Sequence, residues 1–88
     1  MEGSKLSAAT GAEVVLDLHG RNKYQARIAI EAALRRSRGL YRIRVIHGCH
    51  NGTALRDMVW GEYGSDPRVK RLTAASESAT DLILRELY

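Results

Sequence analysis

The alternation of apolar and polar side chains over residues 13–19 predicts a β-strand with one buried face. One side of the segment carries Val14, Leu16 and Leu18, and the other carries Val15, Asp17 and His19. Gly20 then ends the alternation. The segment therefore predicts a strand whose second face presents a carboxylate and an imidazole.

Two later segments have helical rather than strand periodicity. Residues 22–38 place their small and apolar side chains on one stripe, formed by Ala26, Ile30, Ala33, Leu34 and Ser37, and Gly39 supplies a C-terminal stop. Residues 53–63 predict a second helix, which the Gly-Ser-Asp-Pro sequence at 64–67 ends.

Further strands are expected after each helix. Residues 41–46 alternate again, and residues 69–74 predict a third strand. Residues 78–88 fit two patterns, because a helix capping box stands at their start while the apolar run at 82–84 is typical of a strand. The predicted order is strand–helix–strand–helix–strand, followed by one terminal element of either kind.

The first two predicted strands end in the same dipeptide. His19-Gly20 follows the first strand and His47-Gly48 follows the second. Strand–helix–strand units bring their strands parallel through a right-handed crossover, so both dipeptides are expected at one edge of the sheet. Open α/β sheets bind ligands at that edge. With Asp17 on the open face, a carboxylate and imidazoles at this edge could form a phosphodiester site.

The composition indicates one small domain that carries no cofactor. The chain has 88 residues, of which 44% are hydrophobic and 27% charged. We expect a flexible lead-in over residues 1–11 and a single domain over residues 12–88. Cys49 is the only cysteine, so an internal disulfide is excluded, and no Cys/His spacing suggests a metal site. No apolar run approaches the roughly 20 residues that span a membrane. A cytoplasmic monomer with no membrane contact is expected.

The positive charge is concentrated in one part of the chain. The net charge is +4, yet the 24 positions from Arg21 to Arg44 hold eight basic residues and one acidic residue, an excess of seven. Arginine forks match phosphate oxygens, so this region predicts nucleic-acid binding. Arg42 and Arg44 are expected to project from the open side of the sheet beside Asp17. The alternative is a solvated surface that only keeps the protein in solution.

The sequence Leu-Asp-Leu-His-Gly at 16–20, followed about 28 residues later by His47-Gly48 and then Gly52, resembles the Smr (small MutS-related) domain. The resemblance covers residues 13–88. It implies an α/β (α+β sandwich) fold: a mixed four-stranded sheet with two helices on one face, in the order β-α-β-α-β-β. A strand over the last segment is then expected.

The resemblance also implies a function. Smr domains are nucleic-acid-binding modules, and several act as endonucleases on DNA or on messenger RNA at stalled ribosomes. Asp17 and His19 match the family's D-x-H pair, while His47, Gly48 and Gly52 match its H-G-x-G-x-G loop. This chain departs from the loop by carrying a histidine at the middle glycine, and Leu-Arg at 55–56 comes one residue later than in the commonest spacing.

These matches suggest metal-independent cleavage by histidines. His19, oriented by Asp17, would act as the general base on a ribose 2′-hydroxyl or on water, and His47 would protonate the leaving oxygen. RNA is therefore the favoured substrate. Nucleic-acid contacts are expected from Gly20, Arg42, Arg44, Gly48, His50, Gly52 and Arg56, including backbone N–H groups of the glycine loop.

Two other functions stay open. The same fold and charge suit a non-catalytic module that binds nucleic acid or the ribosome, in which Asp17 and His19 only end a strand and the glycines only shape a turn. A metal-dependent nuclease would require several clustered carboxylates, and Asp17 is the one carboxylate expected near the site.

Overall fold

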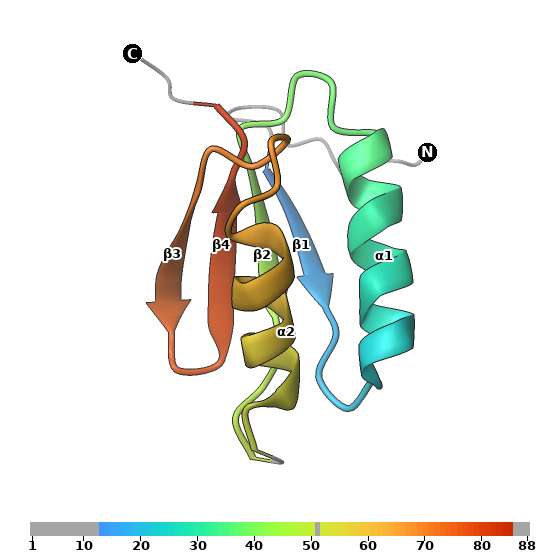
Figure 1. The fold of residues 1–88 in the computed structure, drawn as a ribbon, viewed down its shortest axis with the longest axis vertical. Helices are drawn as coiled ribbons and strands as arrows, with labels where there is room; N and C mark the ends of the chain where they lie inside the picture. Colours follow the sequence, from blue (N-terminus) through green and yellow to red (C-terminus); the bar gives the residue numbers. More distant parts are fainter. Residues whose placement is uncertain (1–12, 51, 86–88) are drawn as a thin grey trace.

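A four-stranded mixed sheet with strand order β1-β2-β4-β3 forms one layer of the molecule (Figure 1). The structure is a computed structural model that describes residues 13–50 and 52–85, so the expected lead-in over residues 1–11 lies outside the described part. The strands are β1 (Glu13–Asp17), β2 (Arg42–Ile46), β3 (Arg71–Ser76) and β4 (Ala79–Ile83). β1 and β2 are parallel, and β4 is antiparallel to both β2 and β3. The expectation of a terminal strand is confirmed.

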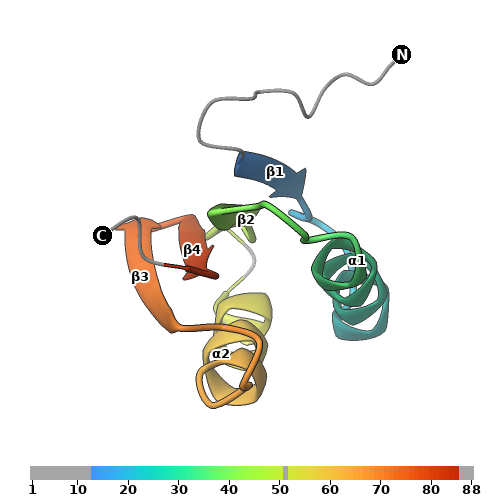
Figure 2. The same cartoon turned by 90° about the horizontal axis from the view of Figure 1, so that it is seen from above.

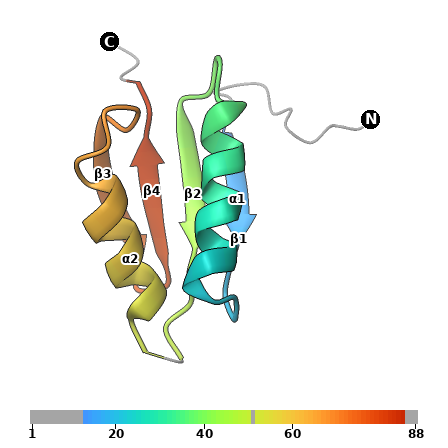
Figure 3. The ribbon, with the colours of Figure 1, turned by 45° about the vertical axis from the view of Figure 1, so that its right-hand side comes forward.

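Two helices, α1 (Lys23–Arg35) and α2 (Ala54–Tyr63), form the second layer and cover the same face of the sheet (Figures 2 and 3). A capping box begins α1: Asn22 accepts from the Gln25 backbone N–H, and the Gln25 side chain accepts from the Asn22 N–H. The predicted α+β fold with two helices on one face is confirmed.

The core lies between the sheet and the helices, on the side that the sequence pattern predicts. Its central residues are Leu18, Ala26, Ile30, Leu34, Ile43, Val45, Met58, Val59, Tyr63 and Leu82. The other face of β1 is open, and Val15 there is 54% exposed. The period-two alternation of β1 therefore separates the core from the face that carries Asp17.

Some element boundaries differ from those predicted. α1 ends at Arg35 rather than at residue 38, because the N–H groups of Arg36 and Ser37 turn back to the carbonyls of Ala33 and Leu34. β3 begins at Arg71 rather than at residue 69, because the Val69 N–H bonds within the preceding turn. β1 ends at Asp17 rather than at His19, which lies in the turn that follows, while β2 ends at Ile46 as predicted.

A polar cluster joins the two helices to the turn before β3. Arg68 donates to both carboxylate oxygens of Glu31 at 3.0 Å and to Asp66 at 2.8 Å, and the Tyr63 hydroxyl donates to Glu31 at 2.8 Å. Arg68 holds the pKa of Glu31 and of Asp66 below their usual range. Arg27 pairs with Glu62 at 2.6 Å and adds a second link between the helices. These contacts fix α1 against α2. Both helices begin at the end of the molecule where β1 and β2 end (Figure 3).

Candidate active site at the carboxyl edge of the parallel strands

The two His-Gly dipeptides meet at one edge of the sheet, as parallel pairing predicts. Asp17 lies opposite Ile46 in the register, and the Leu18 N–H extends the pairing by donating to the Ile46 carbonyl at 2.8 Å. Gly48 lies so close to His19 that an added Cβ would be 3.1 Å from the His19 Cβ. Gly48 also has a φ of 82°. A larger residue at this position would therefore push the loop away from His19.

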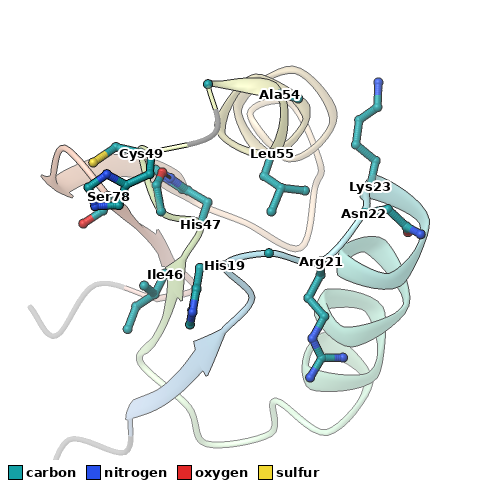
Figure 4. A pocket seen from close by; sticks show the side chains of 14 residues that line it. His19, Arg21, Asn22, Lys23, Ile46, His47, Cys49, Ala54, Leu55 and Ser78 are labelled. Carbon is teal, nitrogen blue, oxygen red and sulfur yellow. Dashed lines mark hydrogen bonds between the residues drawn. The ribbon is translucent and has the colours of Figure 1, made fainter.

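A cavity of about 690 Å³ opens at this edge (Figure 4). Three loops and the starts of α1 and α2 form its wall. The lining residues are His19, Gly20, Arg21, Asn22, Lys23, Ile46, His47, Gly48, Cys49, His50, Gly52, Ala54, Leu55 and Ser78. The wall combines imidazoles and cations with the first turns of two helices, whose N–H groups have no acceptor within the helix. Such a cavity suits an anionic ligand.

Asp17 and His19 form a direct pair, and His19 lines the cavity. His19 Nδ1 lies 2.5 Å from Asp17 Oδ1, and the two side chains are 68% and 57% exposed. The hydrogen bond from His19 holds the pKa of Asp17 below its usual value. Because the carboxylate accepts from Nδ1–H, the neutral imidazole keeps its lone pair on Nε2, which faces away from Asp17. The pair is therefore arranged as an oriented general base.

His47 has a different environment, buried on the helix-covered face of the sheet. Its Nδ1 donates to the Gly48 carbonyl at 3.0 Å, and its Nε2 lies 3.0 Å from Thr80 Oγ1. Trp60 Nε1 also donates to Thr80 Oγ1 at 3.0 Å. The hydroxyl proton of Thr80 is then directed at His47, so both ring nitrogens are engaged. His47 lines the cavity, yet both of its ring nitrogens are taken up by hydrogen bonds within the protein.

The backbone of this loop is held by the turn between β3 and β4. The N–H groups of His47 and Gly48 both donate to the Ser78 carbonyl, at 2.9 and 3.0 Å. The sequence analysis expects the Gly48 N–H to contact phosphate. In the structure this N–H donates to the Ser78 carbonyl instead.

Arg42 and Arg44 project from the open face of the sheet, as predicted, but both lie within ion pairs. Arg44 makes a two-point contact with Asp81, at 2.7 and 3.0 Å, and Arg42 pairs with Glu13 and, at 3.4 Å, with Asp81. The Asp81 side chain is only 6% exposed. Their charge is thus largely neutralised within the sheet, away from the cavity.

Arg21 and Lys23 are the cations that line the cavity, and the sequence pattern did not single them out. They directly follow His19-Gly20 and begin the basic region. Their position just after the strand end is the signal that could have identified them.

Comparisons with known proteins decide the family. The family model described as the Smr domain matches residues 16–80. The chain belongs to the Smr domain family. A search of the solved structures finds the Smr domain of Thermus thermophilus MutS2, with 28% identity and a TM-score of 0.74, covering 83% of this chain and 99% of that one. A search of curated proteins finds no significant match. The Smr domain is a nuclease-related nucleic-acid-binding fold.

The glycine loop of this Smr domain reaches the cavity through residues on both sides of position 51. Gly20 and Gly52 adopt positive φ values of 80° and 92°, and exposed His50 and Gly52 line the cavity. Arg56 lies in the first turn of α2 but outside the cavity wall, with a guanidinium nitrogen 3.8 Å from Asp57. The structure thus brings Gly20, His50 and Gly52 to the site and leaves Arg56 beside it.

Neither helix in the described part of the chain has the length and apolar character of a bilayer-spanning segment. Within residues 13–50 and 52–85, no cluster of three or more His, Cys, Asp or Glu side chains is placed to hold a metal ion.

The bridge from Trp60 through Thr80 to His47 makes a testable prediction about stability. Thr80 is 1% exposed, so Thr80→Val would leave His47 Nε2 and the Trp60 N–H without their shared partner. We expect a loss of about 1–3 kcal/mol in the free energy of unfolding, because buried polar groups would be unsatisfied. Urea denaturation followed by circular dichroism measures it. Thr73→Val, on the opposite face of the sheet, is the control, and equal stability of the two variants would contradict the assignment.

Proposed function

We propose that this Smr domain binds nucleic acid at the cavity and cleaves its phosphodiester backbone, with RNA as the favoured substrate. The observation that carries the proposal is the Asp17–His19 pair, which engages Nδ1 of a residue in the cavity wall and leaves the Nε2 lone pair of His19 free of the carboxylate. Arg21 and Lys23 on the same wall supply positive charge for phosphate oxygens. Family membership supports the same class of function.

The first chemical step falls to His19. Its Nε2 takes the proton of a ribose 2′-hydroxyl, and the 2′-oxygen attacks the adjacent phosphorus while the bond from phosphorus to the 5′-oxygen breaks. Asp17 holds the ring and stabilises the imidazolium that forms. The products are a 2′,3′-cyclic phosphate and a 5′-hydroxyl. DNA has no 2′-hydroxyl and would not be cut by this route.

The leaving 5′-oxygen requires a proton, and His50 is better placed than His47 to supply it. Both histidines line the cavity, but His50 is exposed, whereas His47 is buried and both of its ring nitrogens are hydrogen-bonded. We therefore assign His47 to holding Gly48 against His19 and assign the acid to protonated His50.

A second candidate is a nucleic-acid or ribosome-binding module that does not cleave. The observation that favours it concerns His50, the proposed acid. No hydrogen bond between His50 and a described residue holds its ring in one orientation. An unfixed acid contributes less to catalysis than an oriented one.

Incubation of the purified protein with end-labelled single-stranded RNA and DNA, with and without EDTA, distinguishes these candidates. We expect RNA to be cut in the presence of EDTA, with cyclic phosphate ends, and DNA to stay intact. Binding of both polymers without cutting would support the module and overturn the nuclease. Cutting that EDTA abolishes would support a metal-dependent nuclease and overturn the histidine mechanism.

A further inference from the structure

The solvent-facing side of α1 carries two unusually exposed large side chains. Tyr24 is 68% exposed and Ile28 is 52% exposed. They stand four residues apart, and Arg35 follows seven residues after Ile28, so helical geometry places all three on one stripe opposite the buried Ala26, Ile30 and Leu34. α1 begins beside the cavity, where Lys23 lines the wall. The helix runs from that end of the molecule to the other (Figure 3), and the stripe runs along it.

Cations that form no salt bridge with the described residues lie at both ends of this stripe. Arg21 and Lys23 stand at the cavity end, and Arg35 and Arg36 stand at the far end, and none of the four forms a salt bridge with a described carboxylate. Glu31 lies on the same stripe, between Ile28 and Arg35, but Arg68 and Tyr63 already bind both oxygens of its carboxylate. Other arginines of the fold are less available, since Arg27, Arg42, Arg44 and Arg68 are paired with carboxylates.

We propose that this stripe of α1 is a track for single-stranded nucleic acid leading out of the cavity, with Tyr24 stacking on a base. The 13 residues of α1 span about 20 Å, which separates the two cationic ends and allows one strand to contact both. An exposed tyrosine ring provides a stacking face for an unpaired base, and arginines provide phosphate contacts. The polyanion fits the stripe better than a protein partner does, because cations flank the apolar residues at both ends. The proposal rests on the proposed function. It adds that the bound nucleic acid is single-stranded and that it runs from the cavity along α1.

Fluorescence anisotropy with a labelled oligouridylate tests the track directly. Tyr24→Ala should weaken binding about 5–150-fold, the loss expected for one base stack, while Tyr24→Phe should retain the affinity because its ring still stacks. Val15→Ala is the matched control, since Val15 is a similarly exposed apolar residue on the opposite face of the sheet. The double variant Arg35→Glu/Arg36→Glu should reduce the dependence of affinity on salt by a slope of about 0.7 for each phosphate that the protein no longer neutralises.

An oligonucleotide with abasic positions separates stacking from charge. With this probe, wild type and Tyr24→Ala should bind equally, because no base remains to stack. The wild-type protein could bind the normal oligonucleotide with an affinity that Tyr24→Ala does not lower. That result would overturn the track but leave the proposed function intact. The stripe would then be a candidate surface for contact with another protein. If the wild-type protein binds neither RNA nor DNA single strands, both proposals fall.

Discussion

Replacing His19 with alanine is expected to lower the rate of RNA cleavage by about 10²–10⁴, the usual loss when a general base is removed. Binding should change little, since the cations of the cavity wall, rather than an imidazole, dominate contacts with phosphate. The variant should also fold normally, because the His19 side chain is 68% exposed and the core does not depend on it. Single-turnover cleavage and anisotropy, measured on the same preparation, separate rate from affinity.

Asp17→Asn refines the same prediction. His19 holds the pKa of Asp17 below its usual value, so the carboxylate stays ionised throughout the range in which an imidazole titrates. Asparagine keeps the shape of the side chain but removes the charge that stabilises the imidazolium, so the rate should fall while affinity is kept. Lys70→Ala, a removal of exposed charge near the opposite pole, is the control for both variants. A His19→Ala protein that cuts RNA at the wild-type rate would exclude His19 as the base.

The Asp17–His19 pair could be predicted from sequence because its geometry is local. The alternation over residues 13–19 predicts that the two side chains share a face. Although β1 ends at Asp17, the Leu18 N–H still pairs with the Ile46 carbonyl, so His19 stays next to Asp17. The meeting of Gly48 with His19 was also predictable, since a strand–helix–strand unit makes the two strands parallel neighbours. Both inferences need only periodicity and the handedness of the connection.

The environments of His47 and Arg44 were not predictable in this way, because residues distant in sequence determine them. Thr80, the partner of His47 Nε2, is 33 residues away, and Asp81, the partner of Arg44, is 37 residues away. Both partners belong to β4, the segment whose pattern fitted a helix as well as a strand. The pairing of β4 with β2 could not be derived from the sequence. His47 was therefore interpreted as an imidazole free to act in catalysis, and Arg44 as a cation free to bind phosphate.

The pairing on the open face of the sheet predicts a large loss of stability for Asp81→Ala. Asp81 lies opposite Arg44 in the β2–β4 register and accepts from Arg44 and Arg42. Among residues 13–50 and 52–85, its removal would leave Glu13 as the one carboxylate paired with these two guanidiniums. We expect the free energy of unfolding to fall by about 3 kcal/mol, the low end of the range for breaking a buried pair, because Arg44 remains 36% exposed to water. Urea denaturation measures the change.

A paired replacement and a surface control make this result interpretable. Asp81→Leu combined with Arg44→Met should recover most of the lost stability, because apolar side chains of similar size need no partner. Asp57→Ala removes a carboxylate that is 66% exposed and should cost less than about 1 kcal/mol. If Asp81→Ala were no less stable than Asp57→Ala, the open face would not depend on this network. Arg42 and Arg44 would then be free to bind phosphate, and the charge reversal of both should weaken RNA binding rather than unfold the domain.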